Sequence, residues 1–144
     1  MQESLIIMIG ILISIILIII SIIHIYWAFG GKWGIAGAIP THEGKPLFEP
    51  EPIGTLVVSL GLIFASSIIL GRVGYITLNT RFDFIFEWGI WFLAIVFLLR
   101  AIGDFKYVGL FKKIKDTNFA YWDTRLHSPL CFIISIGLFY LALN

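Results

Sequence analysis

The chain has 144 residues, of which 59% are hydrophobic and 13% are charged, and its mean hydropathy is +0.98. Soluble domains carry about 45–50% apolar and about 25% charged residues, so this composition is typical of a protein embedded in a bilayer. The net charge of +1 argues against the concentrated basic surface that binds nucleic acid, and the one cysteine, Cys131, excludes an intrachain disulfide.

The first span is predicted over residues 5–26, an isoleucine-rich run long enough to cross about 30 Å of hydrocarbon. Lipid offers no hydrogen-bond partner to an isolated strand, so we expect a helix. No basic residue precedes the run and no small-residue cleavage site follows it, so we expect a retained span and not a signal peptide. Its small and polar residues recur at helical spacing and predict one inward-facing stripe: Gly10, Ser14, Ser21, His24 and Ala28.

A long connection follows over residues 30–52, rich in glycine, charge and proline. Each proline of its Glu-Pro-Glu-Pro run disfavours helix at the preceding residue. The second span is predicted over residues 53–70, where Gly61 and Ala65 have the four-residue spacing of a close helix contact in membranes.

The third span is predicted over residues 84–101, with polar side chains at both of its ends. Glu87 lies near its start, and we expect this carboxylate to pair with Arg72 or Arg81 in the preceding turn.

A second long connection follows over residues 102–128. Apolar residues recur there every three positions, with lysines between them, which is typical of a basic amphipathic segment lying at lipid headgroups: Phe105, Val108, Phe111 and Ile114. The fourth span is predicted over residues 130–143, because Ser128 suits a helix cap and Pro129 suits the first helical position.

These spans predict an all-α integral membrane four-helix bundle that forms a single domain over residues 1–144. The two long connections should then share one side of the membrane and the termini the other. Most of the basic residues fall in the long connections, so the positive-inside rule predicts cytoplasmic connections and termini outside: Lys32, Lys45, Arg100, Lys106, Lys112, Lys113, Lys115 and Arg125.

His24 is an ionisable residue near the end of a span, on the predicted inward stripe. Such a residue is a functional-site candidate. The alternative is a structural imidazole that bonds a backbone carbonyl or another helix.

Aromatic residues gather on the side of the long connections, where they suit either of two roles. They could form an interfacial belt, which needs no ligand, or they could wall a pocket for an amphipathic molecule: Tyr26, Trp27, Phe29, Trp33, Tyr107, Tyr121 and Trp122.

Two carboxylates on this side are further candidates. Asp104 lies four residues after Arg100, a spacing that favours a helical ion pair. Asp123 lies four residues before His127 and could orient that imidazole for acid–base chemistry, or could serve only in loop capping.

The histidines and the cysteine lack the spacing of a metal motif, so we predict no metal site and no cofactor: His24, His42, His127 and Cys131.

Three separated motifs resemble one known family: His24-x-Tyr26-Trp27-x-x-Gly30-Gly31, then Gly103-Asp104-x-x-Tyr107-Val108-Gly109-x-Phe111-Lys112, then Ser128-Pro129-Leu130-Cys131. The chain is similar to an uncharacterised domain-of-unknown-function family of small bacterial four-pass membrane proteins. The resemblance implies a four-helix membrane domain and carries over no activity, substrate or catalytic residue.

The preferred hypothesis is a binding or accessory protein whose polar face holds membrane lipid, a lipid-like small molecule or another membrane protein. Its candidate ligand-binding residues are His24, Tyr26, Trp27, Trp33, Asp104, Tyr107, Trp122 and Asp123. A second hypothesis is a small membrane enzyme or redox protein that uses His24, Asp104, Asp123 and His127. A third is an ion or proton pathway, which the nearly pure apolar middle of each span disfavours.

Overall fold

The computed structural model describes residues 1–77 and 82–144 and is all-α apart from one two-stranded hairpin. Within these residues four helical stretches are long and apolar enough to cross a membrane. The first three are α1 (Gln2–Ala28), α2 (Pro52–Arg72) and α3 (Asp83–Ile102). The fourth is made of α4 (Asn118–Trp122), the π-helical segment η3 (Asp123–His127) and α5 (Ser128–Leu143). This confirms the predicted fold class.

The helices pack as two antiparallel hairpins, α1 with α2 and α3 with α5. The α1–α2 interface is built on the predicted stripe, because Gly10, Ser14 and Ser21 are all buried. The Ser21 hydroxyl lies 2.7 Å from the hydroxyl of Ser59, and Ser66 donates a hydrogen bond of 3.5 Å to the carbonyl of Ser14. Small hydroxyl side chains let two helices approach closely in a membrane and bond across their contact.

The predicted contact through Gly61 is wrong. Gly61 is exposed, and no atom lies within 4 Å of the position that a Cβ would occupy there. The face of α2 that meets α1 is instead defined by Ser59 and Ser66, seven residues apart, and Ala65 is buried beside them. Serine is small enough for a close helix contact and also forms an interhelical hydrogen bond through its hydroxyl, which glycine lacks.

The two hairpins meet in one apolar core near the chain termini. A Cβ on Gly137 of α5 would lie 2.7 Å from the Ile13 side chain of α1, and one on Gly89 of α3 would lie 2.8 Å from Ile68 of α2. Large apolar side chains fill the space between them, among them Leu17, Ile69, Ile90, Ile134 and Leu138. Many other apolar side chains point outward, as expected for helices that face lipid.

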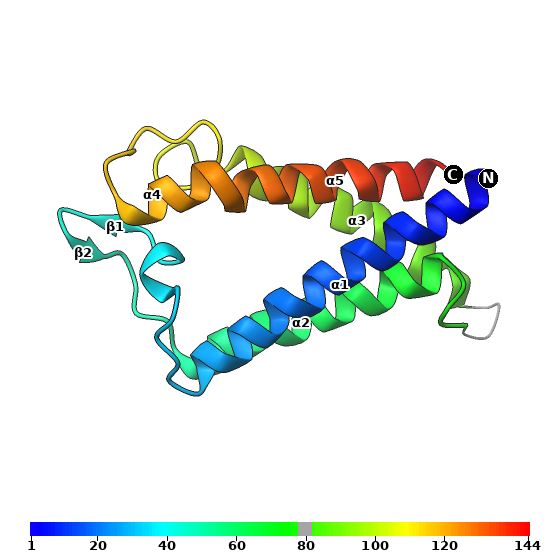
Figure 1. The fold of residues 1–144 in the computed structure, drawn as a ribbon, viewed down its shortest axis with the longest axis horizontal. Coiled ribbons are helices and arrows are strands. Elements are labelled where there is room, and N and C mark those ends of the chain that lie inside the picture. Colours follow the sequence, from blue (N-terminus) through cyan, green and yellow to red (C-terminus); the bar gives the residue numbers. More distant parts are fainter. Residues whose placement is uncertain (78–81) are drawn as a thin grey trace.

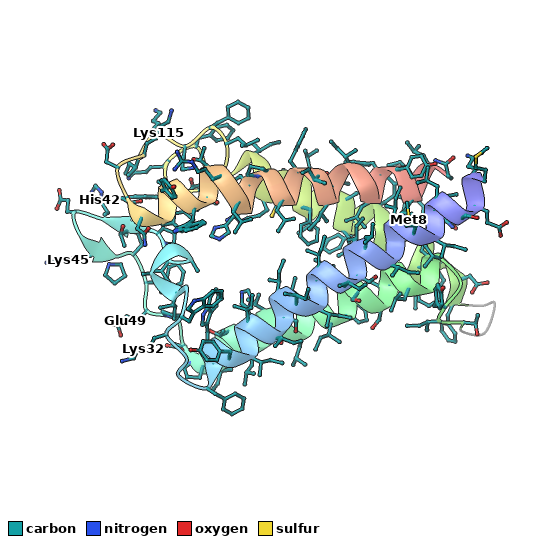
Figure 2. All side chains as sticks on the ribbon, viewed as in Figure 1. Met8, Lys32, His42, Lys45, Glu49 and Lys115 are labelled. Atoms are coloured by element: carbon teal, nitrogen blue, oxygen red, sulfur yellow. The ribbon has the colours of Figure 1, made fainter. Side chains whose placement is uncertain are left out.

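From this core the hairpins diverge toward the opposite end of the bundle, which holds both long connections (Figure 1). We call it the connection end and define it by residues 29–51 and 103–117. The first connection contains the short 3-10 helix η1 (Ile35–Gly37) and the antiparallel strands β1 (Thr41–His42) and β2 (Lys45–Pro46). Figure 2 shows His42, Lys45 and Lys115 at this end and Met8 toward the other.

The fourth helix begins twelve residues before the predicted start at residue 130, which corrects the sequence prediction. Thr117 is the cap, since its hydroxyl accepts a bond of 3.0 Å from the Ala120 amide. Ser128 is helical and caps nothing. Proline lacks an amide proton and its ring collides with the carbonyl four residues back, so Pro129 mimics a helix start. The wider π turn of η3 precedes it, with the Ser128 amide bonded to the Asp123 carbonyl.

The second connection is irregular, and its lysines do not all face lipid headgroups. Phe111 is exposed, whereas the neighbouring Lys112 is only 3% exposed. The prediction of a basic amphipathic segment is therefore wrong at Lys112.

Arg81, one of the two expected partners of Glu87, lies outside the described residues. Glu87 and Arg72 line one cavity of about 350 Å³, and no ion pair joins these two side chains.

Candidate functional site

The first connection touches both α4 and the second connection. Gly37 of η1 packs on the Trp122 indole of α4, where an added Cβ would lie 2.7 Å from the ring. The ring of His42 meets the ring of Tyr107 edge to face, with centroids 5.9 Å apart. The motifs that carry His24, Asp104 and Asp123 therefore lie at one end of the molecule (Figure 1).

Two cavities open where the hairpins diverge. The first, the α2 cavity, has a volume of about 310 Å³ and lies between the end of α1, the start of α2 and the first connection. The second, the α4 cavity, has a volume of about 470 Å³ and lies between α1, the α4–η3 segment and the same connection. Trp27 and Ala38 line both cavities. Ligand pockets usually span about 300–1,000 Å³, so each cavity is large enough to hold part of a small amphipathic molecule.

His24 lines the α2 cavity and is half-buried. Its Nδ1 lies 2.8 Å from the Ile20 carbonyl oxygen, one turn back in α1. A carbonyl oxygen can only accept, so Nδ1 donates this bond, and Nε2 is the acceptor whenever the ring is neutral. The backbone bond predicted by the structural alternative is present, and the same side chain lines the cavity.

Trp27 separates the two cavities and is held on both sides. Its Nε1–H donates a hydrogen bond of 2.8 Å to the Trp33 carbonyl oxygen, and its ring meets the ring of His24 edge to face at 5.0 Å. The Tyr26 hydroxyl accepts a long bond of 3.4 Å from the Trp33 amide, and the Tyr26 ring fills the space beside Gly31. These contacts hold the glycine-rich turn after α1 in place. They also fix the position of the Trp27 indole between the two cavities.

The α4 cavity is lined mainly by aromatic and apolar groups. Trp33 and Trp122 join Trp27 in its walls, and they are 73% and 45% exposed. His127 contributes a half-buried imidazole, packed against Phe119 with ring centroids 6.2 Å apart. This cavity can accommodate an apolar body and offers one titratable side chain to it.

Asp123 has a different environment from either predicted one. It is fully buried, and its Oδ1 accepts a bond of 2.9 Å from Arg100. Its Oδ2 accepts bonds from the Gly109 amide at 2.8 Å and from Lys112 Nζ at 3.0 Å. In the part of the chain that the structure describes, no hydrogen bond links Asp123 to His127. Asp123 therefore does not hold that imidazole by a hydrogen bond, and the loop amide that it bonds is that of Gly109, not one next to Ser128.

Lys112 completes this buried ion cluster, which we define as Arg100, Lys112 and Asp123. Its ammonium group also donates to the Gly109 carbonyl at 2.9 Å and to the Thr124 hydroxyl at 2.7 Å, so all three of its protons have partners. The cluster ties the end of α3 and the second connection to η3. It fixes the α4–η3 side of the cavity.

Asp104 closes the loop that begins the second connection. Its Oδ1 accepts three backbone bonds of 2.7–2.9 Å from Lys106, Tyr107 and Val108. Burial alone would raise the pKa of Asp104, but these amide donors outweigh it and hold the pKa below its ordinary value. The predicted pairing with Arg100 is wrong, because α3 ends at Ile102 and Arg100 turns to Asp123.

Two glycines let the same loop close. Gly103 has φ +85° and Gly109 has φ +96°, and a Cβ on Gly103 would collide with the Val108 carbonyl. The Leu110 amide then bonds the Ala101 carbonyl at 2.9 Å. Asp104 is thus a structural element of a tight loop, and Tyr107 is carried by it to meet His42.

The four residues of the enzyme hypothesis are not assembled into one reactive group. His24 and His127 line different cavities, Asp104 is bonded within its own loop, and Asp123 lies in the ion cluster. Sequence reasoning missed Lys112 and Arg100 as partners of Asp123, and Glu49 and Glu51 at the α2 cavity. No pattern in the lysine-rich run distinguishes the buried Lys112 from the exposed Lys113.

Comparison with known proteins identifies the family. The model of the family described as "protein of unknown function (DUF3995)" matches residues 17–138, which is most of the chain. The chain therefore belongs to this family, which confirms the resemblance carried by its three motifs. No curated protein and no solved structure matches it.

Proposed function

We propose that the protein binds a lipid-like or small amphipathic molecule from the surrounding membrane, in the two cavities at the connection end. The observation that carries this proposal is that Trp27 and Ala38 line both cavities, between hairpins that separate at this end. Apolar walls with a few polar groups are the usual lining of a small-molecule site.

Two features support binding over a purely structural aromatic belt. The Trp27 ring is held by a hydrogen bond to the Trp33 carbonyl instead of pointing freely to headgroups. The buried ion cluster fixes η3 beside the second cavity. A site whose walls are held rigidly loses less conformational entropy on binding.

We also propose that the chain forms one four-span domain with a defined orientation in the membrane. The connection end carries exposed cations on both connections, Lys32, Lys45, Lys106, Lys113 and Lys115 among them, and Figure 2 shows Lys32, Lys45 and Lys115 there. By the positive-inside rule this end is cytoplasmic and both termini are outside. The cavities would then open at the inner leaflet.

The test uses native mass spectrometry of the full chain extracted with its own lipids. Ala38→Phe places a ring where both cavities meet, so we expect the retained amphiphile to fall at least fivefold, whereas Ala36→Phe reaches only the α4 cavity. Val57→Phe is the matched control, because Val57 is 62% exposed on α2 and lines neither cavity. Thermal unfolding of each variant, compared with that of the wild type, checks that the fold is kept.

Two results would overturn the proposal. One is a wild-type chain that carries only lipids in the proportions of the bulk extract. The other is an Ala38→Phe variant that retains as much amphiphile as Val57→Phe. A second protein that copurifies with the wild type and is lost in Ala38→Phe would assign the cavities to a partner membrane protein instead.

A further inference from the structure

We infer that the α2 cavity takes an ammonium group carried on an alkyl chain. This rests on the proposed function and adds the chemistry of the headgroup. The inference follows from the charges at the cavity, from which hydrogen-bond donors are already used, and from the apolar wall that continues beyond them.

The charged side chains that line the α2 cavity are both acidic. They are Glu49 and Glu51, and among the residues that the structure describes no lysine or arginine lines this cavity. Both glutamates are exposed, and within residues 1–77 and 82–144 neither takes part in an ion pair. A headgroup that enters this cavity therefore meets two carboxylates that are free to pair with a cation.

The side-chain donors around the same cavity are already used. Trp27 Nε1–H donates to the Trp33 carbonyl, and His24 Nδ1–H donates to the Ile20 carbonyl. The Thr55 hydroxyl donates to the Glu51 carbonyl at 2.9 Å. The side-chain groups left at the cavity are therefore acceptors, including His24 Nε2 when that ring is neutral, and the Trp27 ring, which together suit an ammonium group.

The start of α2 acts in the opposite direction, but weakly. A helix N-terminus carries about half of a positive charge, which favours an anion. Here the first residue, Pro52, has no amide proton, and the Thr55 amide already bonds the Glu51 carbonyl at 3.0 Å. Two full negative charges on the adjacent glutamates exceed what remains of this partial charge.

The apolar part of the wall sets the other half of the ligand. Ile35, Ile39, Phe48 and Val58 line the cavity and favour an alkyl chain over a small hydrophilic amine. An ammonium on an alkyl chain can be a free long-chain amine or the headgroup of an amine-bearing lipid. Both share the chemistry that the cavity recognises.

The experiment uses isothermal titration calorimetry of the 144-residue chain in a neutral detergent. The ligands are dodecylammonium, dodecanol and dodecyl phosphate. We expect dodecylammonium to bind about fivefold or more tightly than dodecanol, on the scale of exposed charge pairs, and dodecyl phosphate to bind more weakly than dodecanol. Dodecyltrimethylammonium should fall between dodecylammonium and dodecanol, because it cannot donate a hydrogen bond to His24 Nε2.

The variants isolate the glutamates. Glu49→Gln combined with Glu51→Gln should abolish the preference for dodecylammonium and leave dodecanol binding unchanged. Glu43→Gln is the matched control, because Glu43 lies in the exposed turn between β1 and β2 and lines no part of this cavity. Its binding profile should equal that of the wild type.

Equal affinity for dodecylammonium and dodecanol, unchanged in the double variant, would overturn the ammonium preference. The proposed function would survive that result if Ala38→Phe still removed bound amphiphile. Nanodiscs with and without phosphatidylethanolamine separate the two sources. Competition from that lipid assigns the site to a headgroup, and undiminished dodecylammonium binding assigns it to a free amine.

Discussion

Lys112 Nζ lies 3.0 Å from Asp123 Oδ2, and the two side chains are only 1% and 0% exposed. Arg100 binds the other carboxylate oxygen at 2.9 Å, so one buried carboxylate joins two cations from separate segments. A buried ion pair is not strong evidence for stability in itself, but removal of one partner leaves uncompensated charge in a low dielectric. The cluster therefore holds α3, the second connection and η3 together.

Replacement of Asp123 by asparagine should destabilise the protein severely. The substitution leaves the Lys112 ammonium buried without a counterion, and we expect a loss of about 3–5 kcal/mol in the free energy of unfolding. Denaturant unfolding in mixed micelles measures it. Lys113→Met is the control, because the exposed Lys113 should change stability by less than about 0.5 kcal/mol. Equal stability of the two variants would show that the cluster does not stabilise the packing of these three segments.

The sequence and the structure agree where one residue type has one physical role. Ser14 and Ser21 were predicted to face inward because small polar residues in an apolar helix belong at a helix contact, and both are buried against α2. Periodicity within one helix carries this information. The first three spans were equally readable, since about 20 apolar residues have few alternatives in a bilayer.

The sequence fails where a role depends on a distant segment. Lys112 and Lys113 are adjacent and chemically identical, yet the position of η3 buries one and exposes the other. Pro129 marks a helix start in most contexts, but here the π turn before it lets one helix continue from Asn118. The cavities could not be predicted at all, because they arise from the angle between two hairpins.

Gly103 should tolerate no side chain. Its φ of +85° is unfavourable for alanine, and the added Cβ would lie 1.8 Å from the Val108 carbonyl oxygen. We expect Gly103→Ala to cost about 2–4 kcal/mol in unfolding free energy. Gly30→Ala is matched in conformation, with φ +89°, but meets no atom within 4 Å, so it should cost only about 1 kcal/mol. Similar losses in both variants would mean that loop closure around Val108 adds nothing.

Acid should open the loop that Asp104 holds. The pKa of Asp104 is lower in the folded protein because amide bonds to Val108, Lys106 and Tyr107 outweigh the effect of burial. A lowered folded pKa means that the stabilisation is present above the unfolded pKa and is lost as pH falls through the folded pKa. Hydrogen exchange of these three amides should therefore become faster, relative to the intrinsic rate, only in acid strong enough to protonate Asp104.

Asp104→Asn is the control for this pH dependence. The variant cannot ionise, so its protection should be lower at neutral pH and should not change with acid. A wild-type loop that exchanges at the same relative rate at all pH values would contradict the assigned role of the carboxylate.

The serine pair between α1 and α2 should show measurable coupling. Ser21 donates to the Ser59 carbonyl at 3.0 Å and lies 2.7 Å from the Ser59 hydroxyl, fully buried among apolar side chains. Interhelical hydrogen bonds in membranes average about 0.6 kcal/mol, so a Ser21→Ala and Ser59→Ala cycle should give a coupling of about that size. Ser67→Ala is the control, because within residues 1–77 and 82–144 the Ser67 hydroxyl bonds only the Ile63 carbonyl of its own helix, at 3.0 Å. Coupling between Ser21 and Ser67 as large as that between Ser21 and Ser59 would rule out a direct bond across the interface. Ser21→Leu should cost more than Ser21→Ala, because a larger side chain forces the two helices apart where their closest approach depends on a hydroxyl-sized residue.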